Sequence, residues 1–307
     1  MRMSPKAERR QLQLLLLLLL SLSSLLLAPA LASAPLAASS LDVDPAAVAA
    51  QIEALGELSD TAPPAITRVL YSANDVRARN YVKQLMREAG LAVREDAVGN
   101  IYGRLEGRDP SLPAVVSGSH TDAIPHSGKY DGVLGVLGAI EALRAVKAAG
   151  HVPERSLEAL MFASEEPTRF GLSCIGSRAM CGRLDADYLD SLSDANGTTF
   201  LSAARAAGYG SAAMPTKDML ADAFVPKGGI HAFVELHIEQ GPLLEEKELD
   251  IGVVTAIAAP ASVSMDFQGN GGHAGALLMP YRRDAGLAAA ELALAVESEA
   301  YGTGVID

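Results

Sequence analysis

The order of apolar and polar residues along the chain predicts alternating helices and strands. Apolar residues at helical spacing predict helices over residues 43–58, 74–89, 133–148 and 198–207, with Asn74 and Asp75 able to cap the second. Short apolar runs bounded by turn residues predict strands over 91–98, 100–105, 113–120, 156–164 and 230–236. Near the C-terminus, 262–267 alternates like a strand and 283–298 has the pattern of a helix. We therefore expect an α/β fold.

Side chains that commonly bind metals stand at the ends of three predicted strands. His120 ends one strand, the pair Glu165 and Glu166 follows the next, and His237 follows a third, while Asp131 opens a helix. Because open α/β sheets bind ligands at the carboxyl ends of their strands, we expect these side chains to meet at one edge. Each alone has a simpler explanation, as a hydrogen-bonded structural histidine or a surface pair of glutamates. The prediction therefore depends on the whole set.

Imidazole and carboxylate ligands together suit zinc or manganese, and carboxylate-rich sites favour manganese. Two such cations, about 3.5 to 4 Å apart and bridged by a carboxylate, can activate a hydroxide between them. Asp131 is the natural bridge, and a neighbouring glutamate would take the proton of the water. Asp122 can hold the far nitrogen of His120. Three further histidines lack a comparable context, and we expect no site role for them: His126, His151 and His231.

Composition limits the remaining possibilities. The 307 residues are enough for about two domains, and 49% are hydrophobic, so a sizeable core is expected. The formal net charge of −12 argues against nucleic acid as a partner, since phosphate contacts need clusters of lysine and arginine. The two cysteines, Cys174 and Cys181, could form a disulfide in an oxidising compartment or remain free thiols.

Residues 1–34 have the three-part layout of a secretory signal peptide. A basic head precedes the Leu-rich and Ser-rich run 12–27, and small residues up to Ala34 offer cleavage sites. The run is short for a transmembrane helix, so we expect cleavage and no membrane association afterwards. Asn196 begins an N-glycosylation sequon, which agrees with entry into the endoplasmic reticulum and the secretory pathway.

Five segments resemble a known family. They are Ser119-His120-Thr121-Asp122, Tyr130-Asp131-Gly132, Ser164-Glu165-Glu166, Glu235 to Gly241, and Gly271-Gly272-His273-Ala274-Gly275. Together they resemble the dinuclear metallohydrolases related to aminoacylases and carboxypeptidases, in the branch of allantoate, N-carbamoyl-amino-acid and ureidoglycolate amidohydrolases. The resemblance covers about residues 44–298. Residues 250–289 are most similar to the plant ureidoglycolate hydrolases.

The resemblance implies a fold and a domain division. It implies a catalytic metal-binding domain over 35–254, with a mixed central sheet flanked by helices. An inserted α/β sandwich, which serves as lid and dimerisation domain, would begin at 255 and be only partly present by 307. Family members pair through this lid, so an intact version is expected to be a homodimer.

The resemblance also implies a metal site. His120, Asp131 and His237 would hold one divalent ion, and Asp131 would bridge to a second ion held by Glu166. Asp122 would support the catalytic arrangement from beside His120. The ions are expected to be manganese, with zinc as the alternative.

Three further residues receive roles from the resemblance. Glu165 would be the general base, and Gln240 would contact the substrate. His273, on the lid, would polarise the scissile carbonyl. The expected substrate contacts are thus Glu165, His237, Gln240 and His273.

The implied activity is hydrolysis of ureidoglycolate, a small ureido compound, to glyoxylate with release of ammonia and carbon dioxide. Allantoate and N-carbamoyl amino acids are the alternative substrates, and a peptidase activity is a more distant one.

The sequence departs from the family in one important respect, since no histidine follows His273 and the last histidine ligand of the second ion is missing. We therefore expect a fragment, a truncated isoform or an incomplete gene model. Such a chain would be a poor catalyst, or a non-catalytic protein that binds metal or a full-length subunit.

Overall fold

A computed structural model describes residues 41–258 and 262–303. The predicted signal peptide, residues 1–34, lies outside the described residues. The chain divides into one unit that ends at Ile251 and another that starts at Gly252. This division falls three residues before the predicted boundary at 254, and the assignment of the two parts as catalytic and lid domains stays a prediction.

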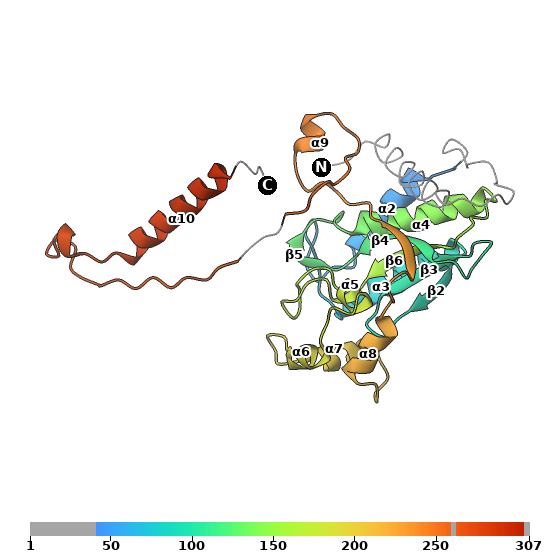
Figure 1. Ribbon diagram of the computed structural model, residues 1–307, viewed down its shortest axis with the longest axis horizontal. Helices are drawn as coiled ribbons and strands as arrows, with labels where there is room; N and C mark the ends of the chain where they lie inside the picture. The colour runs from blue at the N-terminus through green and yellow to red at the C-terminus, as the bar shows by residue number, and fades with distance from the viewer. Residues whose placement is uncertain (1–40, 259–261, 304–307) are drawn as a thin grey trace. The chain divides into compact units, whose positions relative to one another are not determined.

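The first unit is built on a five-stranded mixed sheet in the order β2-β3-β6-β4-β7 (Figure 1). The strands are β2 (Ala92–Glu95), β3 (Ile101–Leu105), β6 (Leu157–Phe162), β4 (Ala114–His120) and β7 (Ile230–Val234). β2 pairs with β3 and β3 with β6 in antiparallel fashion, whereas β4 runs parallel to both β6 and β7. The predicted mixed α/β sheet is confirmed.

β4 lies at the centre of the parallel part, and all seven of its residues are buried. A strand with both faces covered is expected to be a continuous apolar or small-residue run, as β4 is. A side chain at Gly118 would meet the main chain of Leu160 on β6, since an added Cβ would lie 1.8 Å from that carbonyl oxygen. His120 is opposite Phe162, so β4 and β6 end together.

Three helices surround the main core, two of them packed on the sheet and the other packed on a neighbouring helix. They are α2 (Pro45–Gly56), α3 (Ala73–Glu88) and α4 (Val133–Ala148). Their apolar side chains join those of the strands in one cluster that includes Leu55, Val82, Leu137 and Met161. α4 agrees with the predicted helix residue for residue. α3 is capped by Ser72, whose hydroxyl accepts a hydrogen bond from the Asp75 amide, so the predicted cap at Asn74 and Asp75 is wrong.

Four short helices form a second apolar cluster in the same unit. They are α5 (Ile175–Met180), α6 (Ala186–Ser191), α7 (Phe200–Ala206) and α8 (Thr216–Ala223), and Figure 1 shows α6, α7 and α8 close together. Their buried side chains include Phe200 and Met219. Only α7 is predicted by the sequence pattern. The other three helices have six to eight residues, which give barely two turns of periodicity.

A two-stranded sheet is absent from the sequence-based prediction. β1 (Ile66–Arg68) pairs antiparallel with β5 (Ala123–Ser127). β5 lies between His120 and Asp131, where the sequence pattern predicts a loop and no strand. That part of the prediction is wrong. β1 is buried, and its pairing fixes the start of the loop that carries Asp131.

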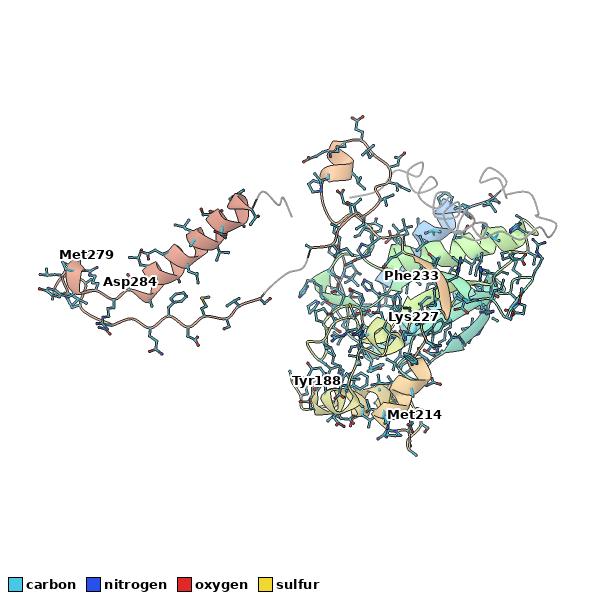
Figure 2. All side chains as sticks on the ribbon, viewed as in Figure 1. Tyr188, Met214, Lys227, Phe233, Met279 and Asp284 are labelled. Atoms are coloured by element: carbon cyan, nitrogen blue, oxygen red, sulfur yellow. The ribbon has the colours of Figure 1, made fainter. Side chains whose placement is uncertain are left out.

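The edge strand β7 is less covered than β4. Its Phe233 side chain, labelled in Figure 2, packs against Phe162 with the rings tilted by 59° and their centroids 5.7 Å apart, and it remains 42% exposed. A single turn, α9 (Leu243–Glu246), follows before the first unit ends. None of the described helices combines the length and apolar character that a bilayer span requires.

The second unit contains the 3₁₀ turn η2 (Met279–Tyr281) and the helix α10 (Ala285–Gly302). α10 is capped by Asp284, which accepts hydrogen bonds from the amides of Gly286 and Leu287. The helix predicted over 283–298 is thus confirmed, but the strand predicted over 262–267 is wrong. Alternation alone does not make a strand, because a strand needs a partner for its main-chain hydrogen bonds, and none of the described residues pairs with this segment.

Candidate metal centre and catalytic site

Three predicted ligands come together at the carboxyl edge of the parallel strands. His120 is the last residue of β4, Asp131 precedes α4, and His237 follows β7. One ligand atom from each lies within 4.8 Å of those of the other two. His237 Nε2 is 3.2 Å from Asp131 Oδ1. The predicted convergence at one sheet edge is therefore present, and the ligand role of the three residues stays a prediction.

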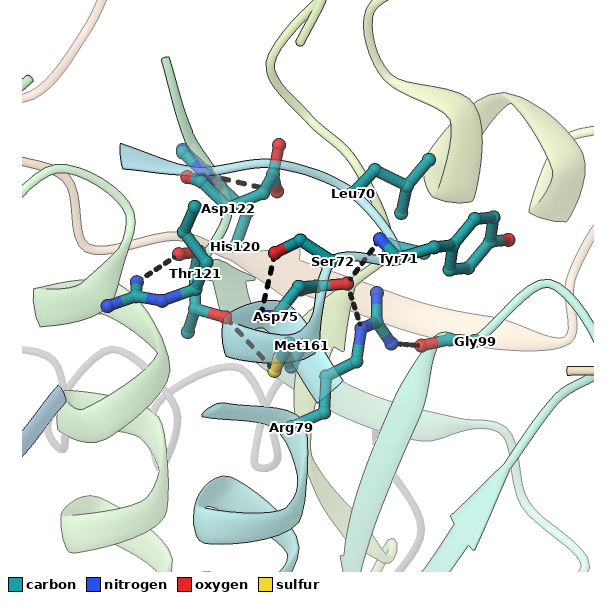
Figure 3. Close-up of polar contacts among 12 residues, drawn as sticks. Leu70, Tyr71, Ser72, Asp75, Arg79, Gly99, His120, Thr121, Asp122 and Met161 are labelled. Carbon is teal, nitrogen blue, oxygen red and sulfur yellow. Dashed lines mark hydrogen bonds and ion pairs between the residues drawn. The ribbon is translucent and has the colours of Figure 1, made fainter. Parts of the chain in front are cut away.

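Asp122 connects His120 to the next strand end. The carbonyl oxygen of Asp122 lies 3.0 Å from His120 Nδ1, closer than its carboxylate oxygen at 3.5 Å. The carboxylate instead accepts hydrogen bonds from the amides of Glu165, at 3.1 Å, and Glu166, at 2.9 Å. Figure 3 shows His120, Thr121 and Asp122 in sequence at this point. Asp122 thus orients His120 mainly through its main chain and holds the two-glutamate turn through its side chain.

Gly132 allows the close approach of the helix α4 to His120. Its φ of +64° lies in the region that side chains disfavour, and an added Cβ would lie 2.5 Å from the His120 ring. Gly135, in the first turn of α4, is similarly tight, because its added Cβ would be 2.4 Å from the Leu236 carbonyl. These two glycines let α4 pack directly against both histidine-bearing segments.

The two glutamates after β6 occupy different environments. Glu165 Oε2 lies 3.7 Å from His120 Nε2, and its side chain is 44% exposed. Its other oxygen, Oε1, is 3.6 Å from Cys174 Sγ. Glu166 is half-buried and outside the three-residue cluster, and burial followed by the nearby Glu165 raises the pKa of its carboxyl. Glu165 therefore faces the cluster, and Glu166 lies close enough for the charge of Glu165 to raise its pKa.

The segment after β7 brings two predicted residues to Asp131. The Gln240 amide donates a hydrogen bond to Asp131 Oδ2 at 2.8 Å, and His237 Nδ1 lies 2.8 Å from the Ile238 carbonyl. Gln240 has a φ of +54° and Ser164, before Glu165, a φ of +47°. Left-handed backbone at non-glycine residues is costly and is found disproportionately at functional sites.

His273 lies in the second unit, where its described contact is local. Its Nδ1 accepts a hydrogen bond from the Gly275 amide at 3.2 Å. The predicted role of His273 at the carbonyl of a substrate stays a prediction.

Cys174 is half-buried and Cys181 exposed, and both are free thiols, so the possible disulfide between them is not formed.

The charges of the cluster favour a bound cation. Burial lowers the pKa of His120, but Asp122 and Glu165 outweigh burial and raise it to about 9. The hydrogen bond with Asp131 raises the pKa of His237, and the same contact lowers the pKa of Asp131. The site therefore attracts positive charge, and its imidazole and carboxylate donors fit a divalent ion such as zinc or manganese.

A cavity of about 400 Å³ lies elsewhere in the first unit. It is lined by residues that include Ala114 and Ile230, the first residues of β4 and β7. It thus opens at the amino ends of these strands, opposite His120 and His237. We locate the functional site at the carboxyl ends because the ligand-type side chains gather there.

Sequence reasoning misses several residues that support the site. Asn100 is fully buried, accepts a hydrogen bond from the Ala163 amide at 2.9 Å and donates to the Gly176 carbonyl, which fixes the strand end before Glu165. Cys174 contacts Glu165, as described above. The partners of Asn100 are more than sixty residues away in the sequence, and no motif indicates either its contacts or that of Cys174.

The family model described as peptidase family M20/M25/M40 matches residues 116–304. The ureidoglycolate hydrolase of Arabidopsis thaliana is 59% identical over 272 residues, which cover 88% of this chain and 56% of that protein. The N-carbamoyl-L-amino acid amidohydrolase of Geobacillus stearothermophilus is 41% identical, covering 81% of this chain and 59% of that protein. The chain thus spans a little over half the length of these curated relatives.

Among solved structures, the crystal structure of AtUAH in complex with glyoxylate superposes with a TM-score of 0.74 at 58% identity. It covers 88% of this chain, and this chain covers 63% of that one.

Replacing Gly132 with alanine is expected to weaken metal binding. The added methyl group must displace the His120 ring. Gly132 thus helps to orient a proposed ligand, and loss of such an orienting contact typically lowers metal affinity by about tenfold to a hundredfold. Competition of Zn²⁺ between the protein and a chromogenic chelator measures the effect. Gly128→Ala is the control, because nothing lies within 4 Å of an added Cβ there. Equal affinities of the two variants would contradict the expectation.

Metal affinity is expected to increase with pH up to about 9. The pKa of His120 is raised to about 9, so below that pH a metal ion must displace a proton from its ring. One displaced proton makes the apparent affinity rise about tenfold from pH 7 to pH 8, and any proton on His237 adds to this dependence. Calorimetry in two buffers of different ionisation enthalpy counts the protons released. His151→Gln should leave the count unchanged, and an affinity independent of pH between 7 and 8 would exclude this account.

Proposed function

Since this chain belongs to the peptidase family M20/M25/M40, we propose that the protein is a metal-dependent amidohydrolase that acts on ureidoglycolate. One observation carries the proposal: the ligand atoms of His120, Asp131 and His237 lie within 4.8 Å of one another. Glu165 stands beside this cluster, 3.7 Å from His120. A divalent-ion site with an adjacent carboxylate is one arrangement that can catalyse the hydrolysis of a C–N bond.

In the proposed net reaction, ureidoglycolate and one water give glyoxylate, two ammonia and one carbon dioxide. Both C–N bonds of the ureido carbonyl and the C–N bond to the glyoxylate carbon are broken. When bound, the divalent ions would polarise the ureido carbonyl and lower the pKa of a water molecule. His120, Asp131 and His237 would hold one ion, with Asp131 as the bridge and Glu166 as a ligand of the second.

Glu165 is proposed as the general base. Its carboxylate would take a proton from the attacking water and deliver it to the departing nitrogen. Its main chain is held by Asp122, so the carboxylate is kept at the edge of the cluster. Gln240 and His273 are proposed to contact the substrate, and a donor such as His273 would stabilise negative charge developing on the carbonyl oxygen.

Sequence similarity supports ureidoglycolate over the alternative substrates. Identity is 59% to the Arabidopsis ureidoglycolate hydrolase and 41% to the Geobacillus N-carbamoyl-L-amino acid amidohydrolase. The structure of AtUAH contains glyoxylate, the product expected from ureidoglycolate. Allantoate and N-carbamoyl amino acids remain as the alternatives that an assay must separate.

The experiment compares ammonia release from ureidoglycolate, allantoate and N-carbamoyl amino acids by the complete product of the gene, loaded with Mn²⁺. We expect turnover of ureidoglycolate and a loss of about 10² to 10⁴-fold in Glu165→Gln, because a positioned base contributes about that factor. Glu154→Gln, at an exposed carboxylate, is the control. Activity confined to allantoate would reject the proposed substrate, and metal binding without turnover of any substrate would reject catalysis.

We propose manganese as the metal and a homodimer as the assembly, in line with the family resemblance. Elemental analysis of protein purified without added metal identifies the ion, and zinc alone would exclude manganese. Light scattering gives the mass in solution. A monomer at micromolar concentration would exclude the dimer.

We also propose that the protein enters the secretory pathway. The basic and Leu-rich pattern of residues 1–34 supports this, as does the exposed position of Asn196 in a turn held by Asp194. Expression in plant cells should give a mature N-terminus near residue 35 and a mass decrease with endoglycosidase. Asn196→Gln should abolish the decrease. A product that retains residues 1–34 and carries no glycan would contradict the proposal.

A further inference from the structure

Arg68 places a charged guanidinium in the interior of the first unit. Its side chain is 1% exposed. It lies on β1 and is not a member of the cluster formed by His120, Asp131 and His237. The guanidinium donates hydrogen bonds to three main-chain carbonyls: Leu58 from Nε at 2.9 Å, Thr121 from Nη1 at 2.5 Å, and Leu55 from Nη2. In the part of the chain that the structure describes, no carboxylate lies within ion-pair distance of it.

One of these carbonyls, that of Leu55, belongs to the last turn of α2, and Leu58 follows the C-cap of this helix, Glu57. The Leu55 carbonyl also accepts a hydrogen bond from the Leu58 amide at 3.1 Å, so Arg68 adds a further hydrogen bond at the end of the helix. A guanidinium at this end is also favourable to the helix dipole. This contact alone would make Arg68 a staple for α2. The third contact, to Thr121, has a different consequence.

Thr121 lies between His120 and Asp122, as Figure 3 shows. Arg68 also stands opposite Ala123 in the pairing of β1 with β5. Its side chain thus holds residue 121 and its main chain pairs with residue 123, so the residue between them, Asp122, has a contact with Arg68 on each side of it. The Asp122 side chain is only 2% exposed, so it has little freedom of its own.

The position of Asp122 determines the orientation of the surrounding site. Its carbonyl holds His120 Nδ1, and its carboxylate holds the amides of Glu165 and Glu166. A shift of this residue would therefore move a proposed metal ligand and the proposed base together. The positive charge of Arg68 also favours this position of Asp122, since Asp75 and Asp122 are among the acids that attract the guanidinium.

We propose that Arg68 is a positioning residue for the metal site, and that its hydrogen bond to the Thr121 carbonyl sets the geometry of His120 and of the Glu165–Glu166 turn. The inference rests on the proposed function of the cluster as a metal site. Burial of an arginine without a carboxylate partner costs free energy. The residue that bears this cost fixes the geometry of the site.

The test measures metal affinity and thermal stability in the same variants. Arg68→Met removes the charge and every donor, whereas Arg68→Lys retains the charge and can reach only part of the carbonyl set. Arg79→Met is the matched control. Arg79 is also 1% exposed, but it pairs with Asp75 at 3.0 Å and donates to the Gly99 carbonyl, away from residues 120–123 (Figure 3).

Competition with a chromogenic chelator, well below each melting temperature, gives the affinity for Zn²⁺, and the visible spectrum with Co²⁺ reports the ligand geometry. We expect Arg68→Met to bind Zn²⁺ about tenfold to a hundredfold more weakly, with an altered Co²⁺ spectrum. Arg68→Lys should be intermediate, and Arg79→Met should remain within about twofold of the parent, even though it too lowers the melting temperature.

Several results would overturn the inference. If Arg68→Met is less stable but binds Zn²⁺ as the parent does, Arg68 is a staple for α2 only. Equal losses of affinity in Arg68→Met and Arg79→Met would likewise show a general effect of destabilisation. If Arg68→Met does not fold, Arg68→Lys decides, since parental affinity at a lowered melting temperature would reject the role. Failure of the parent chain to bind Zn²⁺ or Co²⁺ would reject the proposed metal site itself, which is a distinct outcome.

Discussion

The parallel pairing of β4 with β6 on one side and β7 on the other is the constraint on which the site depends. Parallel strands end at the same edge, so His120, the Glu165–Glu166 turn and His237 are brought together, although more than a hundred residues separate the two histidines in the chain. The buried apolar residues of these strands and of α4 hold that register. A one-residue slip would turn the ligand side chains to the other face of the sheet.

The site is held largely by main-chain hydrogen bonds. His120 contacts the Asp122 carbonyl, His237 the Ile238 carbonyl, and the two glutamates offer their amides to Asp122. Such contacts fix the side chains without neutralising them. The carboxylates therefore keep the negative charge that attracts a cation, while buried hydrogen bonds restrict the motion of the carboxylates and imidazoles.

The sequence predicts much of this arrangement because its signals are local. Four of the five sheet strands and α4 agree closely with their apolar patterns, and the strand-end positions of His120 and His237 follow from the pattern alone. β5 is missed because Ala123–Ser127 contains a proline and no apolar alternation. The strand predicted over 262–267 fails because alternation says nothing about a pairing partner. Arg68 leaves no signal at all, since it contacts main-chain carbonyls that every residue possesses.

The double use of Asp122 has a consequence for how the site tolerates change. One residue supports an imidazole through its carbonyl and a neighbouring turn through its carboxylate. The ends of β4 and β6 therefore both depend on Asp122. Energetic effects of replacements on β4 and in the turn after β6 will then not add, and coupling between contacting residues typically reaches about 0.5 to 3 kcal/mol. Evolution can therefore explore these two segments only in concert, and a change acceptable in one background becomes damaging in another.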